Sequence, residues 1–321
     1  MDTERILPRY VSDDGAVHYT STMSVPDDSV GACYLIPDRI IPVIFVPGIM
    51  GSNLMDSERN PVWLVDSVWS VGSKWATATP AERKLALAPD MTFVCPSGAL
   101  PSNTPHSQNE LQRRGWGEVS AMSYGDFLAW LDHHLNDYHS ETAHGRNGLR
   151  AELMKQVLKS GPTLAPLTHE EVLVSYQYQF PVHAVGYNWL ESNRTSAERL
   201  QSKVREFTTY YRNKGRPCEK VILVTHSMGG LVARYYSEVL GGSNDILGIV
   251  HGVMPATGAA AAYKRVKAGT EGAAGLALGD NAAAVTAVFA QAPGALQLLP
   301  SPDYGMGWLK IRDYDRNVSL P

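Results

Sequence analysis

The chain has 321 residues, of which 44% are hydrophobic, so it can bury one large core or two smaller ones. Its 28 basic and 32 acidic residues leave a formal net charge of −4, which gives no reason to expect a nucleic-acid partner. Cys33, Cys95 and Cys218 are too widely spaced for a metal site or a disulfide framework, which favours synthesis in a reducing compartment.

The amino-terminal stretch MDTERILPRYVSDDG is charged and has no apolar run, so it does not read as a cleaved signal peptide. No stretch approaches the ~18 consecutive apolar residues of a membrane-spanning helix. The sequence therefore predicts a protein that is cytoplasmic as synthesised. Export by a machinery that needs no cleaved signal stays open.

Residues 1–38 are polar, with scattered Pro and Asp, and we interpret them as an irregular amino-terminal arm. A single α/β domain is predicted for residues 39–321. It opens with IIPVIFVPGIMGSNL (40–54), a continuous apolar run typical of a parallel strand covered on both faces, followed by a Gly-rich turn. Residues 55–120 are weakly periodic and read as a long insertion, and long ordered insertions are often functional.

Strands and helices then alternate, which implies right-handed crossovers and a mostly parallel sheet. Ser196 is the expected N-cap of one amphipathic helix, and Lys214 with Gly215 is its expected stop. The predicted helices cover 124–137, 196–215, 229–240, 258–267 and 281–291, and the predicted strands cover 182–185, 221–225 and 246–253. Residues 256–305 are rich in Ala and Gly and read either as a lid or as helices that cover the sheet.

The stretch VILVTHSMGGLVARYY (221–236) places Ser227 between a buried strand and a helix. Ligands collect at the carboxyl ends of strands in such sheets, and a sharp turn there needs small neighbours. Gly229 meets that need, while Thr225 stands where the G-x-S-x-G motif has its first glycine. We therefore predict Ser227 as a nucleophile and the Met228 N–H, at a helix N-terminus, as an oxyanion donor. A phosphate-binding turn is disfavoured because the chain has no G-x-G-x-x-G and no G-x-x-x-x-G-K-[ST] motif.

A second oxyanion donor is expected from the turn after an earlier strand. Val46–Gly51 supplies such a turn, and its two glycines, Gly48 and Gly51, let the backbone approach the substrate. The N–H of Ile49 is the predicted donor. Each donor of this kind is typically worth ~2.7–4 kcal/mol in the transition state.

The segments VIFVPGIMGSNL, GYNWLESN, VTHSMGGLVARYY and IVHGVMPATGAA together resemble the α/β-hydrolase lipases of the lecithin–cholesterol acyltransferase and PGAP1-like group. The resemblance covers about residues 40–260 and departs from the group's Y-D-W-R-like element at Asn188 and Leu190. It implies an α/β-hydrolase fold with helices on both faces of the sheet, a lid insertion, and action on phospholipids or other lipid esters. Some bacterial relatives in the group are toxins injected into rival cells.

The resemblance also makes Trp63 and Trp189 candidate substrate-binding residues. Simple packing is an equal alternative for the three tryptophans of the insertion, which are Trp63, Trp69 and Trp75. Residues 258–299 are apolar and Ala-rich, and they read either as lid helices that could meet a lipid surface or equally as ordinary helices that cover the sheet.

The group's catalytic order is Ser, then an acid, then His. His251 is the one histidine after Ser227, and a structural or pocket role is favoured for it over that of the base. Asp245 precedes its strand and so lies at the wrong end of the sheet, while the later acids fall in the lid or the tail (Asp280, Asp303, Asp313 and Asp315). We therefore expect the acid, the base and the last strands of the fold to lie beyond residue 321.

Other constellations suggest no metal site. Adjacent helical side chains point ~100° apart, so His133 and His134 beside Asp132 do not converge on an ion with His139. His226 is expected to be buried beneath the turn, and His183 lines either a pocket or the core.

The predicted function is that of a serine-nucleophile lipase or esterase that hydrolyses lipid carboxylic esters through an acyl-enzyme, with no metal and no cofactor. The expected partners are a lipid or ester substrate and a transient membrane surface, with no nucleic acid. Two alternatives stay open, which are a lipid acyltransferase and a non-catalytic binding protein on a degenerate hydrolase fold.

Overall fold

A four-stranded parallel sheet forms the centre of the protein, in the order β11-β6-β12-β13. The computed structural model describes residues 4–7, 9–11, 17–20, 29–32, 37–64, 75, 77–136, 152, 166–270, 278–312 and 317–319. The four strands are β6 (Val43–Val46), β11 (Val182–Ala184), β12 (Val221–His226) and β13 (Ile246–Gly252). The prediction of a mostly parallel α/β sheet is confirmed.

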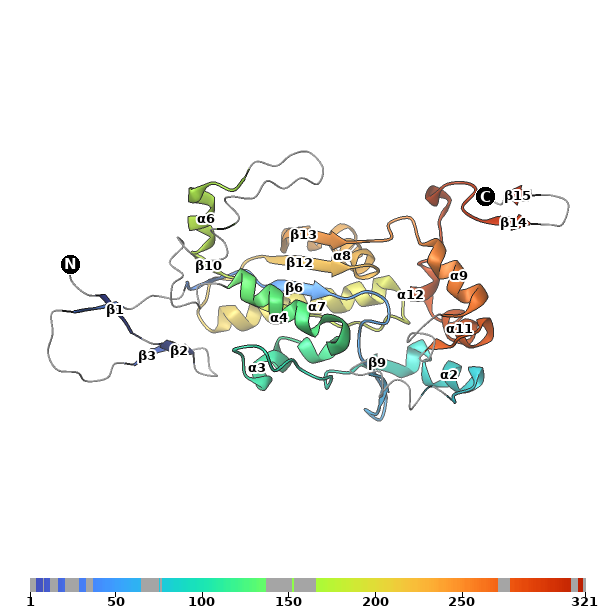
Figure 1. Ribbon diagram of the computed structural model, residues 1–321, viewed down its shortest axis with the longest axis horizontal. Helices are drawn as coiled ribbons and strands as arrows, with labels where there is room; N and C mark the ends of the chain where they lie inside the picture. The colour runs from blue at the N-terminus through green and yellow to red at the C-terminus, as the bar shows by residue number, and fades with distance from the viewer. Residues whose placement is uncertain are drawn as a thin grey trace.

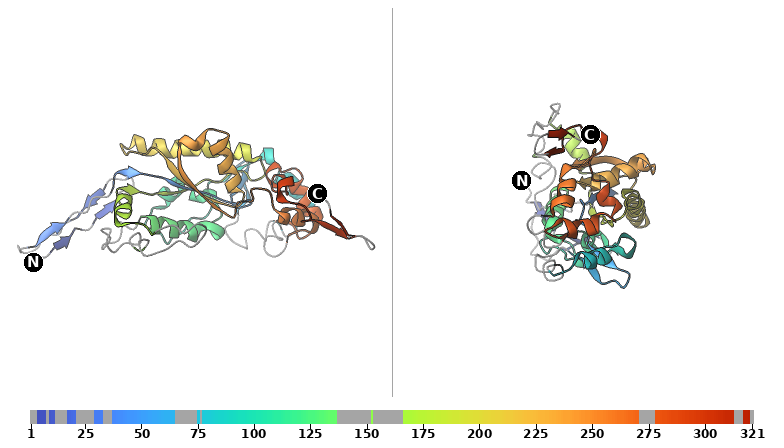
Figure 2. Two further views of the ribbon diagram at one scale, coloured as in Figure 1. Left: turned by 90° about the horizontal axis from the view of Figure 1, so that it is seen from above. Right: turned by 90° about the vertical axis from the view of Figure 1, so that its right-hand side faces the viewer.

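Helices cover both faces of this sheet (Figure 2). One face packs against α7 (Asn193–Asn213) and α8 (Gly229–Glu238), and the other packs against α4 (Ala121–Leu135). Along β6, Ile44 and Val46 belong to the first core, while Val43 and Phe45 belong to the second. Burial on both faces explains why this strand is apolar at every position.

The helix α7 begins one turn earlier than the sequence predicted. Ser192 is its N-cap, and its hydroxyl accepts a hydrogen bond from the Thr195 N–H, whereas Ser196 is buried inside the helix. Both serines are good N-caps, and tertiary packing selects the first. The predicted stop is confirmed, because Lys214 is the C-cap and Gly215 has a φ of +71°.

The insertion at 55–120 is built of short elements that its weak periodicity did not reveal. Three antiparallel strands form a sheet in the order β8-β7-β9, and helices follow. A capping box of Thr79 and Glu82 starts α2, and it was a readable signal in the sequence. The elements are β7 (Leu54–Asp56), β8 (Pro61–Trp63), α2 (Pro80–Ala86), η1 (Pro89–Met91), β9 (Thr92–Val94), α3 (Gln108–Arg113) and η2 (Trp116–Glu118).

The Ala-rich segment forms α9 (Ala260–Ala268), α11 (Ala282–Phe289) and α12 (Pro293–Leu296), close to the two helices predicted there. These helices lie beyond the carboxyl ends of the central strands, next to α2 (Figure 1). Gln291 connects the Ala-rich segment to the insertion, because its Nε2 donates to the carbonyl oxygens of Lys84 and Leu87. The insertion and the lid-like segment therefore form one helical cap at the carboxyl end of the central strands.

Most of the remaining elements lie at the edges of this body or extend from it. The amino-terminal arm, which was expected to be irregular, contains two pairs of three-residue strands and extends away from the sheet (Figure 1). Within the described residues, none of the helices has both the length and the apolar character needed to cross a membrane. The outlying elements are β1 (Glu4–Ile6), β2 (Arg9–Val11), β3 (Val17–Tyr19), β4 (Val30–Ala32), β5 (Arg39–Ile40), α6 (His169–Ser175), β10 (Tyr178–Gln179), η5 (Gly242–Asn244), η6 (Pro302–Tyr304), β14 (Lys310–Arg312) and β15 (Asn317–Ser319).

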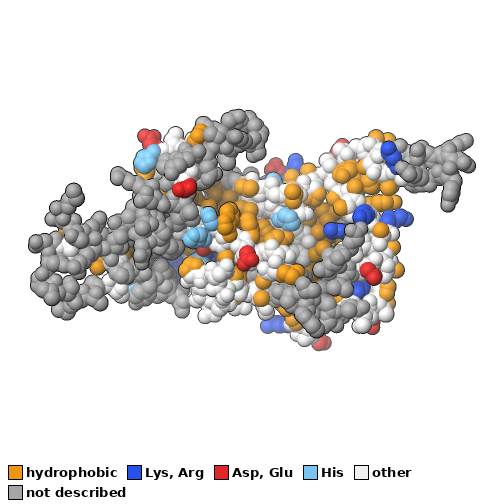
Figure 3. All heavy atoms as spheres, viewed as in Figure 1, with side chains coloured by type: hydrophobic (Ala, Val, Ile, Leu, Met, Phe, Trp, Pro, Cys, Tyr) orange, Lys and Arg blue, Asp and Glu red, His pale blue; other side chains and the backbone are white. Residues whose placement is uncertain are grey.

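The two edge strands of the central sheet differ in how their outer backbone groups are hydrogen-bonded. The outer edge of β11 is capped, because the Val182 N–H donates to Asp132, the Val182 carbonyl accepts from Trp116, and the Ala184 N–H donates to the Arg114 carbonyl. No described strand pairs with the outer edge of β13. This uncharged strand leaves Val250 60% exposed, and Figure 3 shows hydrophobic side chains on the face where β12 and β13 lie.

An uncapped, uncharged edge strand is a template for association with another chain. We expect Val250→Lys to raise the protein concentration at which aggregation begins, because the lysine must stay hydrated. Leu85→Lys is the matched control, since Leu85 is also an apolar, exposed residue, at 76% exposure, but lies on α2. Static light scattering against concentration measures the onset, and equal onsets for the two variants would contradict a special role for the β13 edge.

Candidate active site

Ser227 occupies the joint between β12 and α8 with a left-handed φ of +50°. Its N–H donates to the Gly252 carbonyl at 2.8 Å, and its own carbonyl accepts from the Gly230 N–H at 3.0 Å. The side chain is half-buried at the carboxyl end of the sheet. A strained strand-to-helix turn of this kind presents its central side chain to the crevice above the sheet.

Close backbone contacts explain the glycines around the serine. A Cβ on Gly229 would lie 2.4 Å from the carbonyl oxygens of Val46 and Pro47, so the start of α8 is pressed against the end of β6. Thr225, in place of the usual glycine, is buried, and its hydroxyl lies 2.8 Å from Nδ1 of His251. The threonine fits because β13 offers its hydroxyl a polar partner.

The predicted oxyanion turn lies directly beside the serine. The Gly51 N–H closes the turn on the Gly48 carbonyl at 3.0 Å, and Met50 takes a φ of +64°. A Cβ on Gly48 would be 3.1 Å from Cβ of Ser227, so the turn and the serine are in contact. Neither the Ile49 N–H nor the Met228 N–H has a hydrogen-bond acceptor among the described residues. Both donors are free to bind an oxyanion.

Buried side chains hold this turn from below. The hydroxyl of Tyr187 donates to the Pro47 carbonyl at 2.8 Å, and Nε1 of Trp63 donates to the Met50 carbonyl at 3.0 Å. Complete burial raises the pKa of Tyr187 well above its usual value, so the phenol stays a donor. The turn is therefore fixed before any substrate arrives.

The two tryptophans assigned to substrate binding lie in the core. Trp63 is 3% exposed, Trp189 is fully buried, and their rings meet edge to face with centroids 5.2 Å apart. The structure therefore favours packing over direct contact with an acyl chain. Asn188, next to Trp189 in the chain, binds the insertion, because its Nδ2 donates to the carbonyls of Pro89 and Thr92. Trp75 is also buried, and Trp69 lies outside the described residues.

The sequence interpretation missed Tyr124, and its expectation for His226 was wrong. His226 is exposed rather than buried, because it points to the face of β12 that α4 only partly covers. The Tyr124 hydroxyl lies 3.0 Å from Nδ1 of His226 and accepts the Gly48 N–H at 3.2 Å. Burial raises the pKa of Tyr124 and lowers that of His226. No local signal in the sequence linked a helical tyrosine to this strand end.

His251 lies exposed on β13, one strand from the serine, with its Nδ1 on Thr225. Burial and the charge of Arg234 lower the pKa of His251. The Ser227 hydroxyl makes no hydrogen bond to a described residue. Asp245 accepts from the Tyr236 hydroxyl at the opposite end of the sheet, as predicted. Among the later acids Asp280 and Asp303 are exposed, and Asp313 and Asp315 lie outside the described residues.

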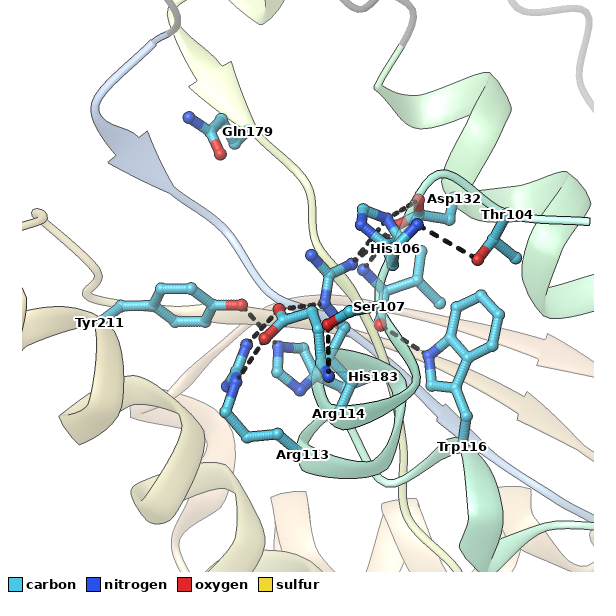
Figure 4. Close-up of polar contacts among 12 residues, drawn as sticks. Thr104, His106, Ser107, Arg113, Arg114, Trp116, Asp132, Gln179, His183 and Tyr211 are labelled. Carbon is cyan, nitrogen blue, oxygen red and sulfur yellow. Dashed lines mark hydrogen bonds and ion pairs between the residues drawn. The ribbon is translucent and has the colours of Figure 1, made fainter. Parts of the chain in front are cut away.

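Asp132 takes part in a buried polar network rather than a metal site (Figure 4). It accepts from Nη1 of Arg114 at 3.0 Å and lies 2.8 Å from Nε2 of His106. His183 is a core residue whose Nε2 meets the Tyr211 hydroxyl at 2.9 Å, and burial lowers its pKa well below the usual range. Within the described ranges no cluster of three or more His, Cys, Asp or Glu side chains could hold a metal. The predicted partner His139 lies outside those ranges.

Comparison with known proteins agrees with this geometry. The family model of the PGAP1-like alpha/beta domain matches residues 190–253, which run from α7 through Ser227 to the end of β13. A chain of the solved structure described as "The crystal structure of Tle4-Tli4 complex" is similar to this chain with a TM-score of 0.74 and 33% sequence identity. The match covers 86% of this chain and 59% of that chain. No curated protein matches.

These two matches confirm the resemblance to PGAP1-like lipases and the α/β-hydrolase fold that the sequence predicted. The chain spans less than two thirds of the length of the similar solved chain.

Proposed function

We propose that the protein is a serine-nucleophile hydrolase that cleaves carboxylic esters of lipids through an acyl-enzyme. One observation carries the proposal. Ser227 is held at a φ of +50° beside two backbone N–H groups that have no acceptor among the described residues. The PGAP1-like alpha/beta domain match across this segment supports a lipase-type hydrolase.

In the proposed reaction, the Ser227 oxygen attacks the ester carbonyl carbon. The carbonyl oxygen becomes an oxyanion that accepts hydrogen bonds from the N–H groups of Ile49 and Met228. Collapse of the tetrahedral intermediate releases the alcohol, which takes a proton, and leaves an acyl-serine. Water then attacks the acyl-serine, releasing the fatty acid and restoring the hydroxyl. Within the described residues, His251 is the candidate to accept the serine proton, because it is exposed on the neighbouring strand at the same end of the sheet.

A lipid substrate suits the surroundings of the serine. The cap helices α11 and α12 are apolar, and Leu296 at the end of α12 and Leu299 shortly after it are exposed. Such a surface could take up acyl chains and touch a membrane transiently. The similar solved chain is in a complex with Tli4, and by analogy we propose that this chain also binds a protein partner.

Two other functions fit parts of the geometry. A non-catalytic binding protein is favoured by the absence, among the described residues, of a histidine hydrogen-bonded to Ser227. An acyltransferase would use the same serine and oxyanion donors, but it needs an acceptor alcohol that outcompetes water.

Ester hydrolysis by the purified chain tests the proposal. Ser227→Ala is expected to lower the rate on p-nitrophenyl butyrate by at least about 10³-fold, because the acyl-enzyme can no longer form. Ser202→Ala is the matched control, since Ser202 is an exposed serine on α7 away from the turn. Equal rates for wild type and Ser227→Ala would assign any hydrolysis to another group.

A further inference from the structure

We propose that Tyr124 is a positioning residue that links the oxyanion turn to His226, and that His226 donates its Nε2–H to an oxygen of the bound ester. The inference rests on the proposed function and deepens it, because it adds a substrate-binding donor beside Ser227.

Three distant segments meet at the Tyr124 hydroxyl. The residue lies in the first turn of α4, and its ring packs on Phe45 of β6 with centroids 4.8 Å apart. Its oxygen is 3.2 Å from the Gly48 nitrogen and 3.0 Å from Nδ1 of His226. The ring also meets the imidazole edge-on at 5.8 Å. One hydroxyl therefore joins the turn that holds an oxyanion to the residue before the nucleophile.

Chemistry fixes the direction of the hydrogen bond between Gly48 and Tyr124, and our proposal assigns the direction of the one between Tyr124 and His226. A backbone N–H can only donate, so the Tyr124 oxygen accepts from Gly48. The hydroxyl proton is then available for Nδ1 of His226, and our proposal assigns Nδ1 as the unprotonated acceptor. A neutral imidazole with a bare Nδ1 carries its proton on Nε2. The burial that raises the pKa of Tyr124 and lowers that of His226 keeps both groups neutral near pH 7.

The Nε2–H of His226 is free to meet a substrate. His226 is exposed, and Nε2 has no partner among the described residues. No Lys, Arg, Asp or Glu side chain of the described residues hydrogen-bonds to His226 or Tyr124, and the residues that contact the pair include Gly48, Gly51 and Phe45. An ester bound at Ser227 brings its carbonyl, alkoxy or phosphoryl oxygens to this side. Each of these oxygens can accept the imidazole N–H.

The oxyanion turn is packed tightly against this hydrogen-bond chain. A Cβ on Gly48 would lie 2.9 Å from Nδ1 of His226, and a Cβ on Gly51 would lie 2.9 Å from the Tyr124 oxygen. Because there is no spare room, a shift of Tyr124 would move the turn and with it the Ile49 N–H. Tyr124 therefore acts on the reaction through the turn and the imidazole.

The first test measures the imidazole itself. Long-range ¹H–¹⁵N NMR on the full chain is expected to show the Nε2–H tautomer of His226 at pH 7. Tyr124→Phe removes the donor that stabilises the neutral ring, so the pKa of His226 is expected to rise by about 0.5–1 pH unit. An Nδ1–H tautomer in the wild type, or an unchanged titration in a folded Tyr124→Phe variant, would overturn the hydrogen-bond chain.

The second test measures reaction at Ser227 with a fluorophosphonate probe. Tyr124→Phe and His226→Phe are each expected to slow the second-order labelling rate by about 5- to 10-fold, the scale of one lost hydrogen bond. His226→Gln should recover most of the rate, because its amide N–H can replace Nε2–H. Tyr235→Phe is the control, because Tyr235 lies on α8 and takes no part in the hydrogen bonds of Tyr124 and His226. Thermal unfolding shows which variants are folded.

The two tests separate the inference from the function it rests on. Labelling that is equal in wild type, Tyr124→Phe and His226→Phe would overturn the substrate-binding role while leaving Ser227 as the nucleophile. A wild-type chain that never labels would overturn the proposed function and the role of His226 in it. The NMR measurement decides the hydrogen-bond chain in either case.

Discussion

Asp132→Ala is expected to destabilise the fold by about 3–5 kcal/mol, because it removes a buried carboxylate that pairs with the buried Arg114. Arg114 is 8% exposed, and its guanidinium donates to Asp132 at 3.0 Å and to Glu110 at 2.7 Å. Asp132 also accepts the Val182 N–H at the edge of β11. The substitution therefore removes an ion pair and uncaps an edge of the central sheet at the same time.

Urea unfolding followed by far-UV circular dichroism measures this loss. Asp126→Ala is the matched control, because Asp126 is an exposed aspartate on the same helix and should change stability by less than about 0.5 kcal/mol. Equal urea midpoints for the two variants would show that the buried network contributes little.

The same network predicts how stability depends on pH. Burial by itself would raise the pKa of Asp132, but the hydrogen bond from His106 and the charge of Arg114 lower it overall. Burial would likewise raise the pKa of Glu110, but the hydrogen bonds and charges of Arg113 and Arg114 lower that pKa to about 2. Both carboxyls therefore contribute stability above their unfolded pKa values of about 4, and this stability is lost as the pH falls through their lowered pKa values in the folded state, which is about 2 for Glu110. In Asp132→Ala the free energy of unfolding should therefore fall less steeply with decreasing pH than it does in wild type.

Gly229→Ala is the second substitution expected to have a large effect on stability and reactivity, because the new Cβ would collide with the backbone. The new atom would lie 2.4 Å from the carbonyl oxygens of Val46 and Pro47, and neither oxygen is the end of a flexible side chain. We expect a loss of about 2–3 kcal/mol of stability, the scale of overpacking a rigid site, together with loss of reaction at Ser227.

Gly248→Ala is the matched control for this substitution. Gly248 lies in β13, and a Cβ there would meet nothing within 4 Å. The control should keep wild-type stability or gain slightly, because alanine restricts the unfolded chain. Urea midpoints and fluorophosphonate labelling of both variants provide the comparison. A stable, reactive Gly229→Ala variant would mean that the start of α8 is not pressed against β6.

The sequence predicted the central sheet and the joint at Ser227 because physical constraints there are local. A parallel strand buried on both faces must be apolar at nearly every position, as β6 is, and a backbone contact of 2.4 Å admits only glycine at position 229. Such constraints restrict which residue types can occupy consecutive positions of the sequence. The same reasoning predicted a turn at Gly48 and Gly51, and the structure places that turn in contact with Ser227.

The parts that the sequence did not predict depend on contacts between distant residues. The strands of the insertion have three residues each, too few to show a period of two. His226 was expected to be buried, but its exposure depends on how far α4 extends over β12. Tyr124 meets His226 across 102 positions of the chain, and no local pattern encodes that meeting.

Labelling of the purified 321-residue chain with a fluorophosphonate probe, followed by peptide mapping, tests most directly that Ser227 is the nucleophile. The structure predicts that Ser227 reacts faster than any other serine, because its turn is strained and the Ile49 and Met228 N–H groups can hold the oxygen of the adduct. The adduct should disappear in Ser227→Ala and persist in Ser202→Ala. A folded chain that takes up no probe, or takes it up at another serine, would contradict the assignment.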